Sequence, residues 1–285
     1  MRAILRHALI LGLMAACSLS CNRGSSTSAG KPTVALVLKT LNHPFFVDMR
    51  RGAQEAADRL GVSLQVQAAE REIVSALVKA RDAKVPIIVV DTRLDPKAAS
   101  DAGVRPATFI GSDNYEGGKL AGDYLVKTTG GKARVAILEG IPGHETGDSR
   151  LRGFRDAVKG APGIAIVASQ PANWERDQGF NVFQNMLQAH ADIDAVFACS
   201  DLMALGAIEA IRAAGRSGSI RVIGFDALDD AKKAIAAGTM EASVAQFPYE
   251  MGRVAVESAV KVVHGEALPA DINVKLALVT RDNVK

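Results

Sequence analysis

Thr33-Val-Ala-Leu-Val-Leu38 is a short apolar strand that runs directly into Lys39-Thr-Leu-Asn-His-Pro-Phe-Phe46, where a helix is predicted to begin. The junction places polar groups and two adjacent aromatic rings at the C-terminal end of a strand. Open α/β sheets bind their ligands just outside the carboxyl ends of their strands. The stretch therefore predicts an α/β fold with one wall of a binding site at residues 42–46.

Strand and helix signals alternate over the rest of the chain. The apolar residues of 46–60 recur with a period of 3.6, and Gly61 then ends the helix, whereas residues 86–90 form a continuous apolar run typical of a strand buried on both faces. Strands are predicted at 33–38, 63–67, 86–90, 107–110, 134–138, 163–168, 195–199, 221–225, 242–245 and 274–279. Helices are predicted at 46–60, 72–82, 115–128, 150–159, 176–189, 202–214, 229–237 and 249–263.

This alternation indicates parallel sheets that helices cover on both faces. The chain has 285 residues, of which 48% are hydrophobic, and this is enough for two domains of roughly 100–150 residues each. The strands fall into two sets, near 33–112 and 113–246. We therefore expect two similar α/β domains with a cleft between them.

Residues 1–21 have the features of a secretory signal. Arg2 and Arg6 precede an apolar run, residues 8–16, that is shorter than the roughly 20 residues of a membrane-spanning helix. Small residues then precede Cys17 and again Cys21, as in a bacterial lipoprotein signal, whose cysteine is lipidated. Residues 22–32 are read as a flexible tether. We expect a periplasmic or cell-envelope protein whose only membrane contact is a lipid anchor; a cleaved signal with two incidental cysteines is the alternative.

Charge and cysteine content exclude several classes of protein. The net charge is only +3, and no basic stripe is interleaved with aromatic residues, so nucleic acid is not an expected partner. Cys199 ends an apolar run and has no partner left in the mature chain. We therefore expect no disulfide framework, no metal cluster and no cofactor, and interpret Cys199 as a small buried hydrophobe.

Hydrogen-bonding or aromatic side chains follow each predicted strand. They are Asn42, His43, Phe45 and Phe46; Asp91, Thr92 and Arg93; Ser112, Asp113 and Asn114; Glu139, His144, Glu145 and Arg150; Gln170, Asn173, Trp174 and Glu175; Ser200 and Asp201; Asp226; and Gln246. Carboxylates accept hydrogen bonds from hydroxyl groups, and the planar guanidinium of arginine donates hydrogen bonds to neighbouring oxygens. Aromatic rings cover the C–H faces of a sugar. The set therefore fits a monosaccharide.

Several of these residues also have a purely structural interpretation. Asp201 and Asp226 could each cap the following helix as readily as contact a ligand. Phe46 could belong to the core, and His43 could cap a helix that begins at the following proline. Trp174 is the only tryptophan and lies in a polar run, which favours a partly exposed position in a site. The hypothesis of a sugar site therefore depends on the whole set of residues.

At these strand ends the sequence resembles the bacterial periplasmic sugar-binding proteins of the ribose-binding type. The matching segments are 40–46, 90–91, 111–118, 150–154, 170–176, 197–206, 222–226 and 245–248. They span nearly all of the chain after residue 32. As a set they are specific to the superfamily, and they discriminate less well between sugars.

The resemblance implies a role for each matching residue. Phe45 and Trp174 would sandwich the sugar ring, with Phe46 beside Phe45. The sugar hydroxyls would be bound by polar groups at the other strand ends: Asp91, Asn114, Arg150, Asp226 and Gln246. The site would thus combine two ring faces with a polar rim.

Three polar positions depart from the ribose pattern. His43 and Ser200 each stand where the ribose binders have an asparagine. Thr92 stands where they have an arginine, although Arg93 could reach the same space. The resemblance therefore leaves ribose open beside another pentose, a hexose or a cyclic polyol.

The resemblance also implies a fold of two doubly wound parallel-sheet lobes joined by three crossovers, near 112–113, 246–247 and 274–276. The N-terminal lobe would hold 33–112 and 247–275, and the C-terminal lobe 113–246 and 276–285. A sugar that contacts both lobes would shift a hinge equilibrium toward a closed form. This closed form, expected to be a monomer, would deliver the sugar to the membrane subunits of an ABC transporter.

The first lobe is short by the standard of that family. Only one helix fits between the strands at 63–67 and 86–90, whereas the family has a further helix and strand there, about 30 residues or one βα repeat. The missing strand would lie beside 33–38. Either the strand at 86–90 moves into the vacancy, or the lobe is incompletely packed. We predict weaker stability and weaker sugar binding than in a full-length relative.

Other functions fit the sequence less well. A sugar-responsive transcription regulator shares the core fold but needs a helix-turn-helix before residue 33, where a secretion signal stands. An enzyme is not expected, because no strand is followed by a Gly-rich dinucleotide motif, and neither a P-loop nor a nucleophilic triad order is present. A chemotaxis-linked sugar receptor and a degenerate protein that binds no sugar remain as alternatives.

Overall fold

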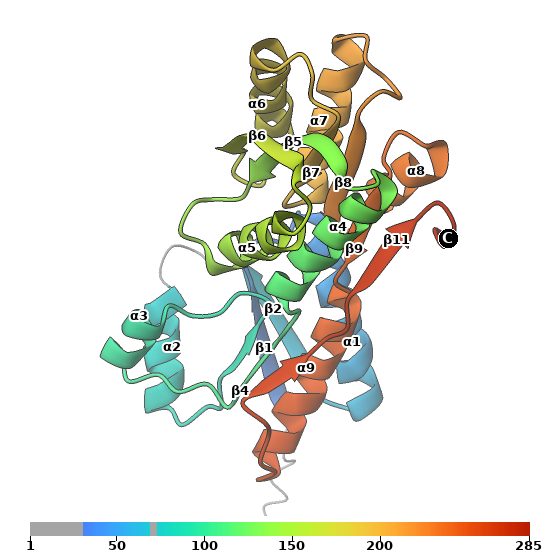
Figure 1. Cartoon of the computed structure of the whole chain (residues 1–285). Helices are drawn as coiled ribbons and strands as arrows, with labels where there is room; N and C mark the ends of the chain where they lie inside the picture. Colours follow the sequence, from blue (N-terminus) through green and yellow to red (C-terminus); the bar gives the residue numbers. More distant parts are fainter. Residues whose placement is uncertain (1–30, 69–72) are drawn as a thin grey trace, which may run out of the picture. The chain divides into compact units, whose positions relative to one another are not determined.

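The computed structural model describes residues 31–68 and 73–285 (Figure 1). The predicted signal at 1–21, with Cys17 and Cys21, and most of the tether at 22–32 lie outside the described residues. Within the described ranges, no helix is both long and apolar enough to cross a membrane.

The largest sheet has six strands in the order β11-β9-β8-β7-β5-β6. Its strands are β5 (Lys132–Glu139), β6 (Gly163–Pro171), β7 (Ala195–Ala198), β8 (Arg221–Asp226), β9 (Ala242–Ala245) and β11 (Ala277–Thr280). The strands from β5 to β9 pair in parallel, as predicted, whereas β11 is an antiparallel edge strand on β9. Strands β7 and β9 are buried along their whole length. The sequence of β7 is accordingly apolar throughout, whereas β9 carries one buried polar residue, Ser243.

Five helices accompany this sheet. They are α4 (Asn114–Thr128), α5 (Glu145–Lys159), α6 (Arg176–Ala189), α7 (Asp201–Ala213) and α8 (Asp229–Ala237). Helix α5 begins before the predicted residue 150, because Glu145 and Asp148 place acidic side chains in its first turn, where the helix dipole favours them. The core beneath the helices includes Phe154 stacked on Phe197, with ring centroids 4.3 Å apart.

The remaining elements form two smaller sheets. Strands β1 (Thr33–Leu38) and β2 (Ser63–Ala68) pair in parallel, and β3 (Ile88–Val90), β4 (Thr108–Gly111) and β10 (Asp271–Asn273) form a separate parallel sheet in the order β10-β4-β3. The accompanying helices are α1 (Pro44–Leu60), α2 (Ile73–Asp82), α3 (Pro96–Asp101) and α9 (Pro248–Val263). Neither α3 nor β10 was predicted, although Asp95 and Pro96 are a helix-start signal.

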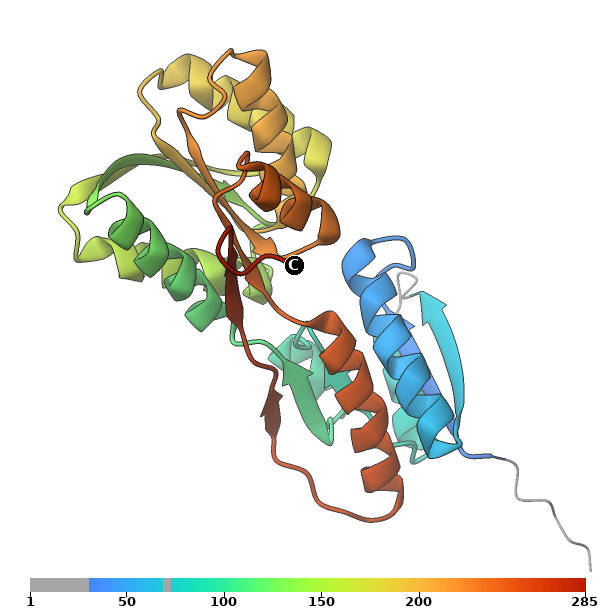
Figure 2. The ribbon, with the colours of Figure 1, turned by 90° about the vertical axis from the view of Figure 1, so that its right-hand side faces the viewer.

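Helices α1 and α9 pack closely against each other (Figure 2). A Cβ atom at Gly52 would lie 1.9 Å from the backbone oxygen of Tyr249, and one at Gly252 would lie 1.9 Å from that of Met49. Glycine is therefore required at both contact points. This pair joins the N-terminal segment to a segment about 200 residues later in the chain.

The expectation of one continuous sheet in the N-terminal lobe is wrong. Within residues 31–68 and 73–285, strand β1 pairs only with β2, and β3 pairs only with β4, so β3 does not move into the vacancy beside β1. Val90, at the end of β3, nevertheless packs against a buried cluster that includes Leu36 and Leu38 of β1. The two sheets thus share a core without sharing a hydrogen-bond ladder.

The chain passes between the smaller sheets and the six-stranded sheet three times. The passages lie between β4 and α4, between β9 and α9, and between β10 and β11. They agree with the three predicted crossovers, and each one follows a strand.

Candidate functional site

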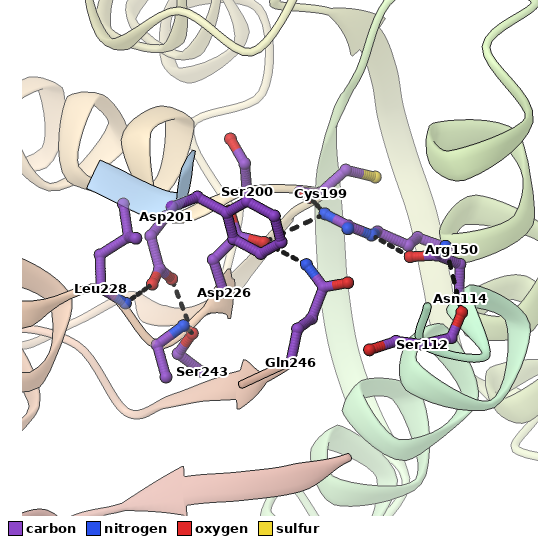
Figure 3. A network of polar contacts seen from close by, with 12 residues as sticks. Ser112, Asn114, Arg150, Cys199, Ser200, Asp201, Asp226, Leu228, Ser243 and Gln246 are labelled. Carbon is purple, nitrogen blue, oxygen red and sulfur yellow. Dashed lines mark hydrogen bonds and ion pairs between the residues drawn. The ribbon is translucent and has the colours of Figure 1, made fainter. Parts of the chain in front are cut away.

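Arg150 lies at the centre of a buried polar network (Figure 3). Its Nε donates to Asn114 Oδ1 over 2.9 Å, and one terminal nitrogen donates to the backbone oxygen of Cys199 at 2.7 Å and to Asp226 Oδ1 at 3.4 Å. The guanidinium also lies over the ring of Phe225, 3.8 Å from its centroid. These contacts from α4, from the residue after β7 and from β8 fix the orientation of the guanidinium.

Asp226 and Gln246 come from the ends of two adjacent strands, β8 and β9. The Gln246 amide nitrogen donates to Asp226 Oδ1 at 2.6 Å, whereas Gln246 Oε1 is buried and has no hydrogen-bond partner among the described residues. Burial raises the pKa of Asp226 to about 6, against the opposing effect of Arg150. Buried polar atoms are rarely left unpaired, so the amide oxygen is an acceptor that the described residues leave unused.

Asp91, which follows β3, interacts electrostatically with Arg150 and Asp226. Its carboxylate accepts a hydrogen bond from the Thr92 hydroxyl at 3.1 Å. Burial raises its pKa, whereas the charges of Arg150 and Lys39 lower it. The charge of Asp91 in turn raises the pKa of Asp226. The structure therefore groups this predicted residue with Arg150 and Asp226.

His43, Phe45 and Phe46 form an aromatic cluster at the start of α1. Ring centroids are 5.8 Å apart between His43 and Phe46 and 5.3 Å apart between Phe45 and Phe46, both with edge contacts. Phe45 is buried in the core shared with β1, and Phe46 is half-buried. Of the two phenylalanines, Phe46 is therefore the one whose ring is partly exposed.

His43 caps α1 as well as standing beside these rings. Its Nδ1 accepts a hydrogen bond from the backbone N–H of Phe45 at 3.2 Å. Burial and the charge of Lys39 lower its pKa, so the imidazole is neutral at pH 7. Since Nδ1 is an acceptor, the proton resides on Nε2, and this second nitrogen is a hydrogen-bond donor.

Trp174 follows β6 and is half-buried. Its ring lies against Gly140 and Gly147, where an added Cβ would come within 2.2 Å and 3.0 Å of ring atoms. The guanidinium of Arg150 is 5.6 Å from the ring centroid. The structure thus places the predicted aromatic wall beside the polar network.

Two predicted residues have other contacts. Ser200 is buried and caps α7, and its hydroxyl accepts from the backbone N–H of Met203 at 3.5 Å. Arg93 pairs with Asp271 at 2.6 Å and lies 3.8 Å from the centroid of Phe109. Among the described residues it shares no hydrogen-bond partner with Arg150, but it lines a cavity of about 230 Å³ together with Asn114. Its role in ligand binding stays a prediction.

Strained backbone gathers at these strand ends. Six of the seven described non-glycine residues with positive φ follow strands of the site: Asp91, Asn173, Trp174, Asp226, Ala227 and Phe247. Such conformations cost about 1–3 kcal/mol each and persist where the surroundings impose them, commonly at ligand sites. The sequence did not predict this feature, because the enrichment of Asn, Asp and His at positive φ is too weak to single out particular residues.

Sequence reasoning also left the role of Asp201 open and did not single out Ser243. Both are completely buried, and Figure 3 shows them on the side of Asp226 that faces away from Arg150 and Asn114. Across residues 31–68 and 73–285, no group of three or more His, Cys, Asp or Glu side chains could hold a metal ion.

Comparisons with known proteins identify relatives over most of the chain. A sequence profile described as a periplasmic binding protein domain matches residues 66–267. The ribose import binding protein RbsB of Escherichia coli strain K12 is 40% identical over 278 aligned positions, which cover 90% of this chain and 93% of that protein. The D-ribose/D-allose-binding protein of Pseudomonas aeruginosa is 34% identical, with 93% of each chain covered.

A solved structure has the same fold. An ABC transporter periplasmic solute-binding protein from Actinobacillus succinogenes 130z, with bound D-allose, superimposes with a TM-score of 0.84 at 36% identity. The match covers 88% of this chain and 98% of that protein.

Proposed function

The chain belongs to the periplasmic binding proteins of the ribose-binding type, and on that premise we propose that it binds one monosaccharide at the network of Arg150, Asp226 and Gln246 and delivers it to an ABC transporter. The observation that carries this proposal is the pairing of a fixed guanidinium and carboxylate with the free, buried oxygen of Gln246. A sugar hydroxyl both donates and accepts, so it can satisfy such a set simultaneously.

The proposed ring contacts come from both sides of the network. Phe46, backed by Phe45, offers one apolar face, and Trp174, held against two glycines, offers the other. His43 contributes a donor through Nε2, whereas the asparagine of the ribose binders could also accept. This difference favours a sugar that presents a lone pair, such as a ring oxygen, to position 43. Asp91, Asn114 and Ser200 complete the proposed polar rim, with Arg93 on the lining of the same cavity as Asn114.

D-Ribose and D-allose are the first ligands to test, because the relatives described above bind one or both. Residues 33–112 with 247–275, and 113–246 with 276–285, are proposed as the two lobes that close on the sugar. The protein is proposed to act as a lipid-anchored monomer in the cell envelope. The known relatives are binding proteins rather than enzymes.

Fluorescence of the single tryptophan offers a direct test, since Trp174 is part of the proposed site. The mature protein would be titrated with D-ribose, D-allose, D-galactose and myo-inositol, with a parallel thermal-shift measurement. Saturable quenching or enhancement with at least one sugar, with binding at least about tenfold weaker in Asp226→Asn, supports the proposal. No response to any sugar would favour the degenerate alternative.

A further inference from the structure

Asp226 owes its position to a turn that its own sequence disfavours. Its φ is +108° and that of Ala227 is +51°, and neither residue is glycine. Left-handed conformations are unfavourable for residues with a Cβ atom, so neighbouring groups must hold this turn in place. The question is which groups do so.

Two buried side chains bind the backbone of the turn. The Ser243 hydroxyl, on β9, accepts the N–H of Ala227 at 3.0 Å and donates to Asp201 Oδ1 at 2.7 Å. Asp201 Oδ2 accepts the N–H of Leu228 at 2.7 Å. Consecutive amides of the turn are thus tied to one carboxylate, directly and through one hydroxyl (Figure 3).

The surroundings are shaped for this carboxylate. Asp201 is the first residue of α7, where the helix dipole favours a negative charge. A Cβ at Gly224, on β8, would lie 2.2 Å from Asp201 Oδ1, so glycine leaves the room that the carboxylate occupies. Asp201 and Ser243 are both completely buried, and their side-chain oxygens are occupied by the turn and by each other.

We infer that Asp201 and Ser243 are positioning residues for sugar binding, which hold the strained turn so that Asp226 faces Arg150 and Gln246. This inference rests on the proposed function, because Asp226 must contact the sugar. Neither residue is a helix cap or a ligand contact, the two roles that the sequence suggested for Asp201. Their effect on affinity passes entirely through Asp226.

A double-mutant cycle tests the inference. Ser243→Ala removes the acceptor of the Ala227 amide and should raise the Kd for D-allose or D-ribose about tenfold. In an Asp226→Asn background the same change should raise Kd less than twofold, because the position of residue 226 then matters little. A merely structural defect would act equally in both backgrounds. Ser258→Ala, which removes a buried hydroxyl on α9, is the matched control and should leave Kd unchanged.

Hydrogen exchange separates this inference from the proposed function. Amides 227 and 228 should exchange faster in Ser243→Ala and Asp201→Ala, with or without sugar, and Ser258→Ala should not alter them. Unchanged exchange, or faster exchange with unchanged affinity, would overturn the positioning role. Sugar binding that Asp226→Asn leaves intact would overturn the proposed site, and the exchange of the two amides would still test how the turn is held.

Discussion

Replacement of Arg150 by methionine is expected to destabilise the protein strongly and in a pH-dependent way. Arg150 is 3% exposed, and its loss leaves the buried Asp226 carboxylate without its cation and leaves Asn114 and the Cys199 carbonyl without their donor. Removal of one partner from a buried ion pair costs about 3–5 kcal/mol. We expect a loss of that size in the free energy of unfolding at about pH 8.

The sign of the pH dependence follows from Asp226. Its pKa in the folded protein is about 6, above the ordinary value of 3.8, and the positive charge of Arg150 holds it down. In Arg150→Met the folded pKa therefore rises further. The burial penalty of the ionised carboxylate is fully present above the folded pKa and is relieved as the pH falls below it. At about pH 5 only the lost hydrogen bonds remain, worth about 1–3 kcal/mol.

Urea unfolding at both pH values measures this difference. The matched control is Arg152→Met, which removes an exposed arginine from the same helix and should change the free energy of unfolding by less than about 0.5 kcal/mol. Equal losses at the two pH values, or a loss below about 1 kcal/mol at the higher one, would refute the electrostatic account of the network. Sugar binding by Arg150→Met at wild-type affinity would refute its role in the site.

Three further outcomes are expected. Since an ionised Asp226 is the proposed acceptor and its pKa is about 6, calorimetric affinity for sugar should fall about tenfold between about pH 7.5 and about pH 5; a flat profile would speak against it. Gly140→Ala places a Cβ 2.2 Å from the Trp174 ring, so it should shift tryptophan fluorescence and weaken binding about tenfold, whereas Gly160→Ala, whose Cβ meets nothing within 4 Å, should do neither. Amides of β1 and β3, on the divided sheets, should exchange faster than those of β5 and β7; equal protection would argue that the division has no energetic consequence.

The architecture was largely predictable, because strands and helices with clear periodicity leave a local signal. The alternation of elements, the stop at Gly61 and the gathering of polar residues at strand ends all follow from such signals and are seen in the structure. The sequence carries no comparable local signal for which strands pair with each other. The short spacing before residue 86 revealed a missing repeat, but it could not show whether β3 would pair with β1, since that depends on tertiary competition for one edge.

The site was predictable as a set and less so in its internal geometry. Arg150, Asp226 and Gln246 meet as expected because parallel strands end at the same edge of a sheet. Phe45 proved to be a core residue, and Arg93 pairs with Asp271, a residue for which the sequence suggested no role. The support that Asp201 and Ser243 give to the turn was invisible, since it depends on backbone conformations that only the folded chain reveals.

Isothermal titration of the mature protein with D-ribose and D-allose, beside Asp226→Asn, tests the central claim most directly. We expect one sugar bound per chain, more weakly than by a full-length relative because the first lobe lacks a repeat, and binding at least about tenfold weaker in the variant. Absence of saturable binding for either sugar, or equal binding by the variant, would contradict it.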